Sequence, residues 1–248
     1  MKLWISEINL KMLKVFTTVT NQPAFAQLQA QTFEKFLDCE YEFHLVDDSF
    51  EHMNLSQEYI NICERNSIHY HRKDHRITPH HPMMGCAYAV QWTYDNLIKK
   101  CQDDIVLFLD SDMFLLRNFD PVSYMEDKTI TACMQDRGDV WYMWNGIIIF
   151  NMPKVLSLKG DLNFNCGNVE GEFTDVGGHT YYFIKENNLE VDDVKPLWGG
   201  SYNGIELENM ETFMDGKFFH FRGGTLWDGK ADVYERKLSI LNNILETV

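Results

Sequence analysis

The sequence lacks any long hydrophobic run. No stretch approaches the ~18 consecutive apolar residues that a membrane-spanning helix needs. The first 16 residues include Lys11 and Lys14 and hold no apolar segment of the kind found in secretory signals. We therefore expect a cytoplasmic protein with no transmembrane segment.

Close cysteine pairs are missing too. The six cysteines are scattered and form no CxxC pair: Cys39, Cys63, Cys86, Cys101, Cys133 and Cys166. This spacing argues against a cysteine-based structural zinc site and indicates reduced thiols, which fits the cytoplasm. The sequence also holds no internal repeat, low-complexity segment or linker, so we expect residues 1–248 to form a single domain.

Basic charge is scarce. Lys and Arg number 22 against 37 Asp and Glu, which gives a formal net charge of −15. A surface with this excess repels polyanions, so nucleic acid and anionic membranes are excluded as expected partners. A phosphate ester as ligand would need a metal or a local basic patch to balance the charge. The 248 residues are 45% apolar, enough for a sizeable core.

Strand and helix patterns alternate along the chain. Residues 13–20 are rich in β-branched side chains, an amphipathic helix follows Pro23, and residues 41–46 form a second strand pattern. This is a βαβ unit, whose strands run parallel. Helices are also expected at 57–66, 85–100 and 234–245, and strands at 68–71, 105–109, 129–134 and 141–150. The sequence thus predicts an α/β fold with a mostly parallel central sheet flanked by helices.

The stretch 104–116, DIVLFLDSDMFLL, is central to this fold. Its apolar residues 105–109 are typical of a strand buried on both faces of a sheet, and the strand ends in Asp110-Ser111-Asp112. Ligands of open α/β sheets lie outside the carboxyl ends of the strands. Two carboxylates at such a place repel each other, and a hard cation between them relieves the repulsion. A solvated turn is the alternative.

Two further regions of the first half are candidates for binding an anion. The stretch 69–81 combines basic residues with five histidines: His69, His71, His75, His80 and His81. Because these histidines lack the i, i+4 spacing of a helical zinc site and lie beside prolines, we expect a basic or merely solvated loop. Gly85 begins a predicted helix whose free N–H groups could receive a phosphate, or it only shapes the turn.

The second half holds other polar residues in apolar surroundings. Asn145 precedes a glycine within WYMWNGIIIF, where glycine admits a ligand or marks a bulge. Asp175 stands before a helical stretch, as a catalytic or acceptor-binding carboxylate or as a plain N-cap. Trp198, Tyr202 and Asn203 suit stacking on a sugar with hydrogen bonds at its rim, or ordinary packing.

His220 ends an aromatic strand pattern. Arg222, Gly223 and Gly224 follow it. These residues offer a metal ligand, a phosphate clamp and open backbone amides. A purely structural histidine is the alternative.

Five segments of the chain, taken in order, resemble those of GT-A type nucleotide-sugar glycosyltransferases. The likeness is greatest to the glycogenin and lipopolysaccharide galactosyltransferase group. The segments are VDDS at 46–49, LFLDSDMFLL with its DxD, WNGIIIFN, FTDVGGHTYYF and FFHFRGG. In the fourth segment Val176 stands where that group has a glutamine after the aspartate. The resemblance implies a GT-A fold, with a nucleotide-binding part at about 13–117 and a part at about 118–248 that receives the acceptor and completes the metal site.

The resemblance also implies the chemistry. The donor would be a nucleoside-diphosphate sugar, with UDP favoured over GDP, and the acceptor a glycan or another hydroxyl. Asp110, Asp112 and His220 would hold Mn²⁺ or Mg²⁺, which would neutralise the diphosphate. The other implied roles are nucleotide binding for Thr18, Asp47 or Asp48 and Asp110, contact with the diphosphate or sugar for Gly85, stabilisation of developing charge for Arg222, Gly223 and Gly224, and sugar or acceptor contact for Asn145 and Asp175. Asp175 would be the base of an inverting enzyme.

Three other functions compete with this one. A haloacid-dehalogenase-like phosphatase also has DxD after an apolar strand, but there DxD opens the catalytic core, whereas two strand–helix units precede it here. A nucleotidyltransferase would need a Gly-rich basic loop after the first strand, and TTVTNQPAF has none. A non-catalytic carbohydrate-binding protein would use Trp198, Tyr202 and Trp227, but it has no need of a metal site.

Overall fold

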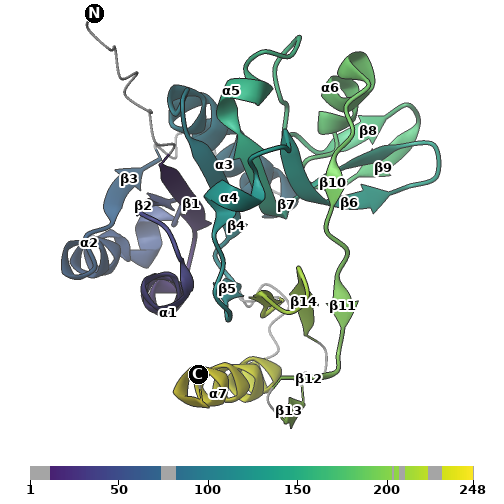
Figure 1. Ribbon diagram of the computed structural model, residues 1–248. Coiled ribbons are helices and arrows are strands. Elements are labelled where there is room, and N and C mark those ends of the chain that lie inside the picture. Colours follow the sequence, from purple (N-terminus) through teal and green to yellow (C-terminus); the bar gives the residue numbers. More distant parts are fainter. Residues whose placement is uncertain (1–11, 74–81, 203, 207–209, 223–230, 248) are drawn as a thin grey trace, which may run out of the picture.

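The computed structural model of the chain describes residues 12–73, 82–202, 204–206, 210–222 and 231–247 (Figure 1). Its largest element is a seven-stranded sheet in the order β10-β6-β7-β4-β1-β2-β3. The strands are β1 (Leu13–Val19), β2 (Tyr41–Asp47), β3 (His69–Arg72), β4 (Ile105–Asp110), β6 (Ile130–Asp136), β7 (Trp141–Asn151) and β10 (Asp192–Asp193). β7 pairs antiparallel with β4 and β6, and every other neighbouring pair is parallel. The prediction of a mostly parallel central sheet is confirmed.

Helices cover both faces of this sheet (Figure 1). They are α1 (Pro23–Phe36), α2 (Ser56–Arg65), α3 (Pro82–Asn96), α4 (Pro121–Tyr124), α5 (Met152–Val155) and α6 (Thr180–Asn187), with short 3₁₀ turns at Glu51–Met53 and Ile98–Lys100. Because successive side chains of a strand point to opposite faces, Leu107 packs in the core beneath α1 and α2, and Phe108 packs in the core beneath α3. The α/β layers therefore follow directly from the buried strands.

A second, antiparallel sheet lies beside the large one, in the order β11-β14-β15-β5. Its strands are β11 (Leu197–Trp198), β14 (Glu211–Phe213), β15 (Phe218–His220) and β5 (Met113–Leu115). Two hairpins, β8 (Gly167–Val169) with β9 (Glu172–Thr174) and β12 (Ser201–Tyr202) with β13 (Ile205–Glu206), complete the strands.

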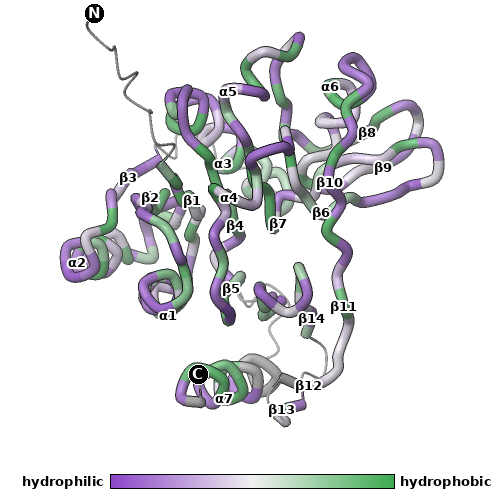
Figure 2. Tube along the Cα trace, in the orientation of Figure 1, coloured by the Kyte–Doolittle hydropathy of each residue, from purple (hydrophilic) through white to green (hydrophobic). Residues whose placement is uncertain are grey.

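The C-terminal helix α7 (Ala231–Thr247) packs on the outer face of the second sheet (Figure 1). Leu241 and Ile244 bury against Phe114 and Phe219, and hydrophobic and hydrophilic residues of α7 lie on different sides of the helix (Figure 2). The predicted amphipathic helix is confirmed, and its partner is the small sheet. Among the described residues, no helix combines the length and apolar character needed to cross a bilayer.

Two expectations for local structure need correction. The helix expected at 85–100 begins three residues earlier, at Pro82, and ends at Asn96 before a separate 3₁₀ turn. Proline suits a first helical position, because its fixed φ is that of a helix and its missing N–H would have no partner there. In addition, the apolar residues after the DxD form strand β5, which belongs to a second sheet that the sequence patterns did not predict.

Candidate active site at the carboxyl edge of the sheet

The DxD turn joins the two sheets. Asp110 is the last residue of β4 in the large sheet, and Met113 is the first of β5 in the small one. Gln29 of α1 is buried beneath the turn, and its Nε2 donates to the carbonyl oxygens of Asp110 and Met113, both at 2.9 Å. Thr18 lies opposite Asp110 in the parallel β1–β4 pair. The turn is thus held from α1, at the carboxyl edge where a ligand was expected.

Asn145 comes to the same place from β7. The pairing of β6 with β7 shifts register between Ala132 and Met134, which is a β-bulge. A bulge re-aims side chains near it, and Asn145, which is 2% exposed, donates from Nδ2 to Asp110 Oδ1 at 2.7 Å. The bulge that was one alternative for this segment is therefore present, and Asn145 contacts Asp110 beside it.

His220 reaches the turn from β15. It lies opposite Met113 in the antiparallel pair with β5, and its Nε2 is 3.3 Å from Asp112 Oδ1. The other ring nitrogen, Nδ1, lies 2.6 Å from Oε1 of Glu211, the residue opposite His220 on β14. If Nδ1–H donates to this carboxylate, the lone pair of Nε2 faces Asp112.

Glu211 was missed by the sequence reasoning. It is 6% exposed, although a glutamate is almost never fully buried without a partner. Its role depends on the antiparallel register of β14 with β15, which no local pattern reveals. The only signal in the sequence is a charged residue close to the apolar residues Met210 and Phe213.

The imidazole of His220 also rests on an aromatic wall. The ring of Trp144 lies 5.2 Å from that of His220 and stacks on Phe213 at 5.9 Å. Trp144 lies over Gly146, where a built Cβ would be only 2.0 Å from the indole. Glycine is therefore needed at 146, because any side chain would displace Trp144 from beneath His220.

Burial and charge set unusual pKa values in this group. Burial, followed by the charge of Asp112, raises the pKa of Asp110 to about 7. Burial lowers the pKa of His220, but the negative charges of Asp112 and Glu211 outweigh it and raise the pKa to about 10. The Cys86 thiol has its pKa raised by burial and by Asp110, so it too borders the site. The carboxylates here favour a nearby positive charge.

The donor set fits a divalent cation. Two carboxylates and one imidazole are ligands suited to Mn²⁺, and two adjacent ligands of an octahedral ion lie about 3 Å apart. The 3.3 Å between His220 Nε2 and Asp112 Oδ1 is close to that spacing. The ligand atoms of Asp110, Asp112 and His220 do not all lie within 4.8 Å of one another. Asp112 and His220 are thus the part of the expected metal site that the structure brings together.

Asp175 lies near these residues, in the loop between β9 and α6. Its charge contributes to the raised pKa of Asp110. Its Oδ1 accepts from the N–H of Val176 at 2.7 Å, and its own N–H donates to the hydroxyl of Tyr142. It is not the N-cap of α6, a position taken by His179. The alternative prediction, that Asp175 is the N-cap of this helix, is therefore wrong.

Val176 stands where the family that the sequence resembles has a glutamine, and its surroundings explain the difference. The side chain is 4% exposed and packs in the core beneath α3 and α6. Gly177 follows with φ +92°, and a Cβ there would lie 2.0 Å from the carbonyl oxygen of Met143. The loop is thus pressed against β7, and residue 176 faces the core.

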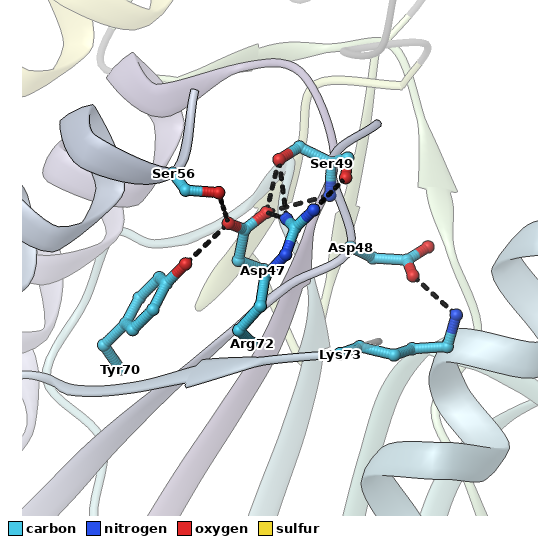
Figure 3. A network of polar contacts seen from close by, with 7 residues as sticks. All are labelled: Asp47, Asp48, Ser49, Ser56, Tyr70, Arg72 and Lys73. Carbon is cyan, nitrogen blue, oxygen red and sulfur yellow. Dashed lines mark hydrogen bonds and ion pairs between the residues drawn. The ribbon is translucent and has the colours of Figure 1, made fainter. Parts of the chain in front are cut away.

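Asp47 lies at the end of β2 and is wholly engaged by protein donors (Figure 3). Its Oδ1 accepts from Ser49 and is 2.7 Å from Nη1 of Arg72. Its Oδ2 accepts from the hydroxyls of Ser56 and Tyr70 at 2.8 and 2.7 Å. Asp48, in contrast, forms an ion pair with Lys73 at 2.8 Å (Figure 3). Of the two aspartates, Asp47 therefore serves to shape the strand end.

The remaining candidates are spread over three elements. Gly85 lies in the first turn of α3, and a Cβ built there meets no described atom within 4 Å. Trp198 of β11 is 58% exposed, and the guanidinium of Arg222 lies 4.5 Å from its ring centre. Arg222 has φ +58°, so the chain turns sharply after β15. Tyr202 ends β12. Asn203, Gly223, Gly224 and Trp227, like His75, His80 and His81, lie outside the described residues.

Comparisons with known proteins found similarity among solved structures. No family model matches the chain, and no curated protein matches it. Among solved structures, it is similar to the galactosyltransferase LgtC in complex with donor and acceptor sugar analogs, at 14% identity over 59% of this chain and 60% of LgtC, with a TM-score of 0.40. An active-site mutant of LgtC gives 16% identity over the same 59% and 60%, with a TM-score of 0.42.

A third similar structure is the mannosyltransferase PcManGT from Pyrobaculum calidifontis in complex with GDP-Man and Mn²⁺. Its identity is 12%, over 73% of this chain and 54% of that chain, with a TM-score of 0.49. The chain thus matches between 54% and 60% of the length of these three structures. All three similar structures are of glycosyltransferases.

Proposed function

We propose that this chain is a metal-dependent glycosyltransferase that moves a sugar from a nucleoside-diphosphate sugar to a hydroxyl acceptor, such as one on a glycan. The observation that carries the proposal is the meeting of Asp112 and His220, 3.3 Å apart, at the carboxyl edge of the sheet. Asp112 follows the buried strand β4, and His220 arrives from a separate sheet. A divalent cation is the partner that this donor set fits.

Each side chain has a definite part in the proposed reaction. Asp112 and His220 would hold the cation with Asp110, and the cation would stabilise the diphosphate leaving group. Glu211 fixes the ring of His220, and Asn145 fixes the carboxyl of Asp110. Both contacts are made between the protein's own side chains, and fixed contacts of this kind preorganise a site.

The nucleotide would lie along the ends of β1 and β2. Thr18 is next to Asp110 there, and Asp48 is the better candidate of the aspartate pair, because the donors around Asp47 already occupy both of its oxygens. Asp175 is near enough to affect Asp110 electrostatically and would accept the proton of the acceptor hydroxyl in an inverting reaction. In a retaining reaction it would position the sugar instead. Trp198, with Arg222 over its ring, would offer a stacking face to the acceptor or sugar.

Calorimetric titration of UDP and GDP, each with and without Mn²⁺, tests this function. We expect one of the two to bind only when Mn²⁺ is present, which also identifies the base of the donor. Failure of both, together with hydrolysis of a generic phosphate ester, would contradict the proposal and favour a phosphatase that uses Asp110 and Asp112.

A further inference from the structure

A second cluster of potential metal ligands lies at the opposite end of the same strands. Glu42 and His44 are near the beginning of β2, and His69 is the first residue of β3. The parallel register places His44 opposite His69 and Glu42 opposite Lys14. The aspartates that end β2 are about 17 Å further along the strand from Glu42, at ~3.3 Å per residue. The cluster is therefore separate from the DxD site.

The ligand atoms of this cluster already converge. Oε2 of Glu42 is 3.5 Å from Nε2 of His44 and 3.8 Å from Nε2 of His69. All three atoms lie within 4.8 Å of one another, which is the closest such grouping of three among the described residues. Two ligands of a tetrahedral zinc ion, each about 2.0–2.1 Å from the metal, lie roughly 3.3–3.4 Å apart. The two separations measured from Glu42 exceed this spacing by about 0.5 Å or less.

The imidazole ring of His44 is held in an orientation that suits a metal ligand. Its Nδ1 is 3.1 Å from Nε2 of His71, so a proton on Nδ1 would leave the lone pair of Nε2 toward Glu42. That Nε2 is buried and has no hydrogen-bond partner, although a buried polar atom normally has one. The ring is fixed between Phe16, at 4.5 Å, and His69, at 4.6 Å.

We propose that Glu42, His44 and His69 bind Zn²⁺, with the fourth position open to water. Imidazole nitrogen and carboxylate oxygen are ligands that zinc accepts. His69 has a side chain that is 55% exposed and gives the ion access from solvent. Because the ligands come from two adjacent strands, the ion would tie β3, the last strand of the sheet, to β2. This site neither requires nor excludes the proposed transferase activity.

The positive charge of Lys14 lowers the affinity of this cluster for zinc. Its ammonium is 2.8 Å from the same Oε2 of Glu42, so zinc has to displace one positive charge from the carboxylate. Replacement of Lys14 by an uncharged side chain of similar shape therefore favours the metal. This makes a directional test possible, in which one substitution weakens binding and a neighbouring one strengthens it.

Calorimetric titration of Zn²⁺ alone into the full chain tests the proposal. We expect a zinc-binding event that survives Asp112→Asn, which changes the other metal site, and that survives His52→Ala, which removes an exposed histidine outside the cluster. His69→Ala and Glu42→Gln should each weaken that event by about tenfold or more. Because His69 is largely exposed, its replacement leaves the core intact, and thermal unfolding without metal provides the check.

Two further readings sharpen this test. Zinc should raise the Tm of Asp112→Asn and leave that of the double variant Asp112→Asn/His69→Ala unchanged, because only the former keeps the three-ligand cluster that gains binding energy in the folded state. Lys14→Met should bind zinc more tightly than the wild type. Undiminished zinc binding in both His69→Ala and Glu42→Gln, or no zinc binding by the wild type, would overturn the proposal.

Discussion

Two aspartates stand at the ends of β2 and β4, with β1 between these strands, and their surroundings are opposite. The carboxylate of Asp47 receives the donors of Ser49, Ser56, Tyr70 and Arg72 (Figure 3). Among the described residues, the one side chain that donates to the carboxyl group of Asp110 is that of Asn145. The pKa values follow this difference: hydrogen bonds outweigh burial and lower the pKa of Asp47, while burial and Asp112 raise that of Asp110 to about 7.

The comparison shows that the position of a carboxylate at the end of a strand does not by itself determine its role. Both carboxylates end a buried strand at the same edge of the sheet, where ligands are expected. One is satisfied by the protein and maintains the fold, whereas the other is buried beside like charge and favours a cation. Four substitutions, taken from the largest expected effect to the smallest, test this distinction.

Asp47→Ala should lower the free energy of unfolding by about 3–5 kcal/mol, because it leaves the partly buried guanidinium of Arg72 and several hydroxyls without their acceptor. Urea unfolding measures the loss. Asp139→Ala, at an exposed aspartate, is the matched control and should stay within ~0.5 kcal/mol of the wild type. A loss below ~1 kcal/mol for Asp47→Ala would break the comparison.

The stability supplied by Asp47 also depends on pH. Because its pKa is lower in the folded chain than in the unfolded one, the stabilisation is complete above the unfolded pKa and declines as pH falls through the folded value. Acid unfolding curves of the wild type and Asp47→Asn should therefore converge at low pH.

Gly146→Ala should cost about 1–3 kcal/mol of stability, since a Cβ there overlaps the indole of Trp144 and forces repacking. It should also weaken Mn²⁺-dependent nucleotide binding, because Trp144 supports His220. Thermal unfolding and calorimetry together measure both effects. Unchanged nucleotide binding alongside lowered stability would show that the aromatic wall does not position His220.

Glu211→Gln should reduce Mn²⁺ affinity by about 10–100-fold, the usual effect of removing a carboxylate that orients a ligating histidine. The amide retains the shape of the side chain, so Tm serves as the control for folding. Glu211→Asp, which keeps the charge, should recover part of the affinity. Equal affinity in the wild type and Glu211→Gln would mean that His220 needs no such partner.

Gly85→Ala has the smallest expected effect on the fold. Alanine is favoured over glycine in a helix by about 1 kcal/mol, and a Cβ at this position meets no described atom within 4 Å. We therefore expect equal or slightly higher Tm. If the diphosphate lies against this turn, nucleotide affinity falls at the same time, which would extend the site to α3. Undiminished nucleotide binding would remove Gly85 from it.

The large sheet could be predicted from the sequence because its strands are continuous apolar runs that alternate with amphipathic helices. Residues 13–20, 41–46 and 105–109 were placed to within one or two positions of β1, β2 and β4. The small sheet was missed, since its strands have two or three residues each and one of its pairs, β5 with β15, joins segments about a hundred residues apart along the chain.

In the candidate site, too, residues within local patterns were predicted, and a residue that depends on strand pairing was not. Asp110, Asp112 and His220 were predicted from local patterns and the family resemblance, and the structure brings Asp112 and His220 together. Glu211 was not predicted, because its importance comes from cross-strand pairing. The cluster of Glu42, His44 and His69 was missed for a similar reason: a strand was predicted at 68–71, but its register with the strand at 41–46, which places His69 opposite His44, has no local signal.

The central claim is that Asp112 and His220 hold a cation. The most direct measurement is titration of Mn²⁺ into wild type, Asp112→Asn and His220→Ala, each with the nucleoside diphosphate that binds, together with their Tm values. We predict that Asp112→Asn keeps a Tm near that of the wild type, that His220→Ala loses stability because buried Glu211 is left without its partner, and that both variants lose more than about 100-fold in Mn²⁺ affinity. Wild-type affinity in both variants would contradict the account.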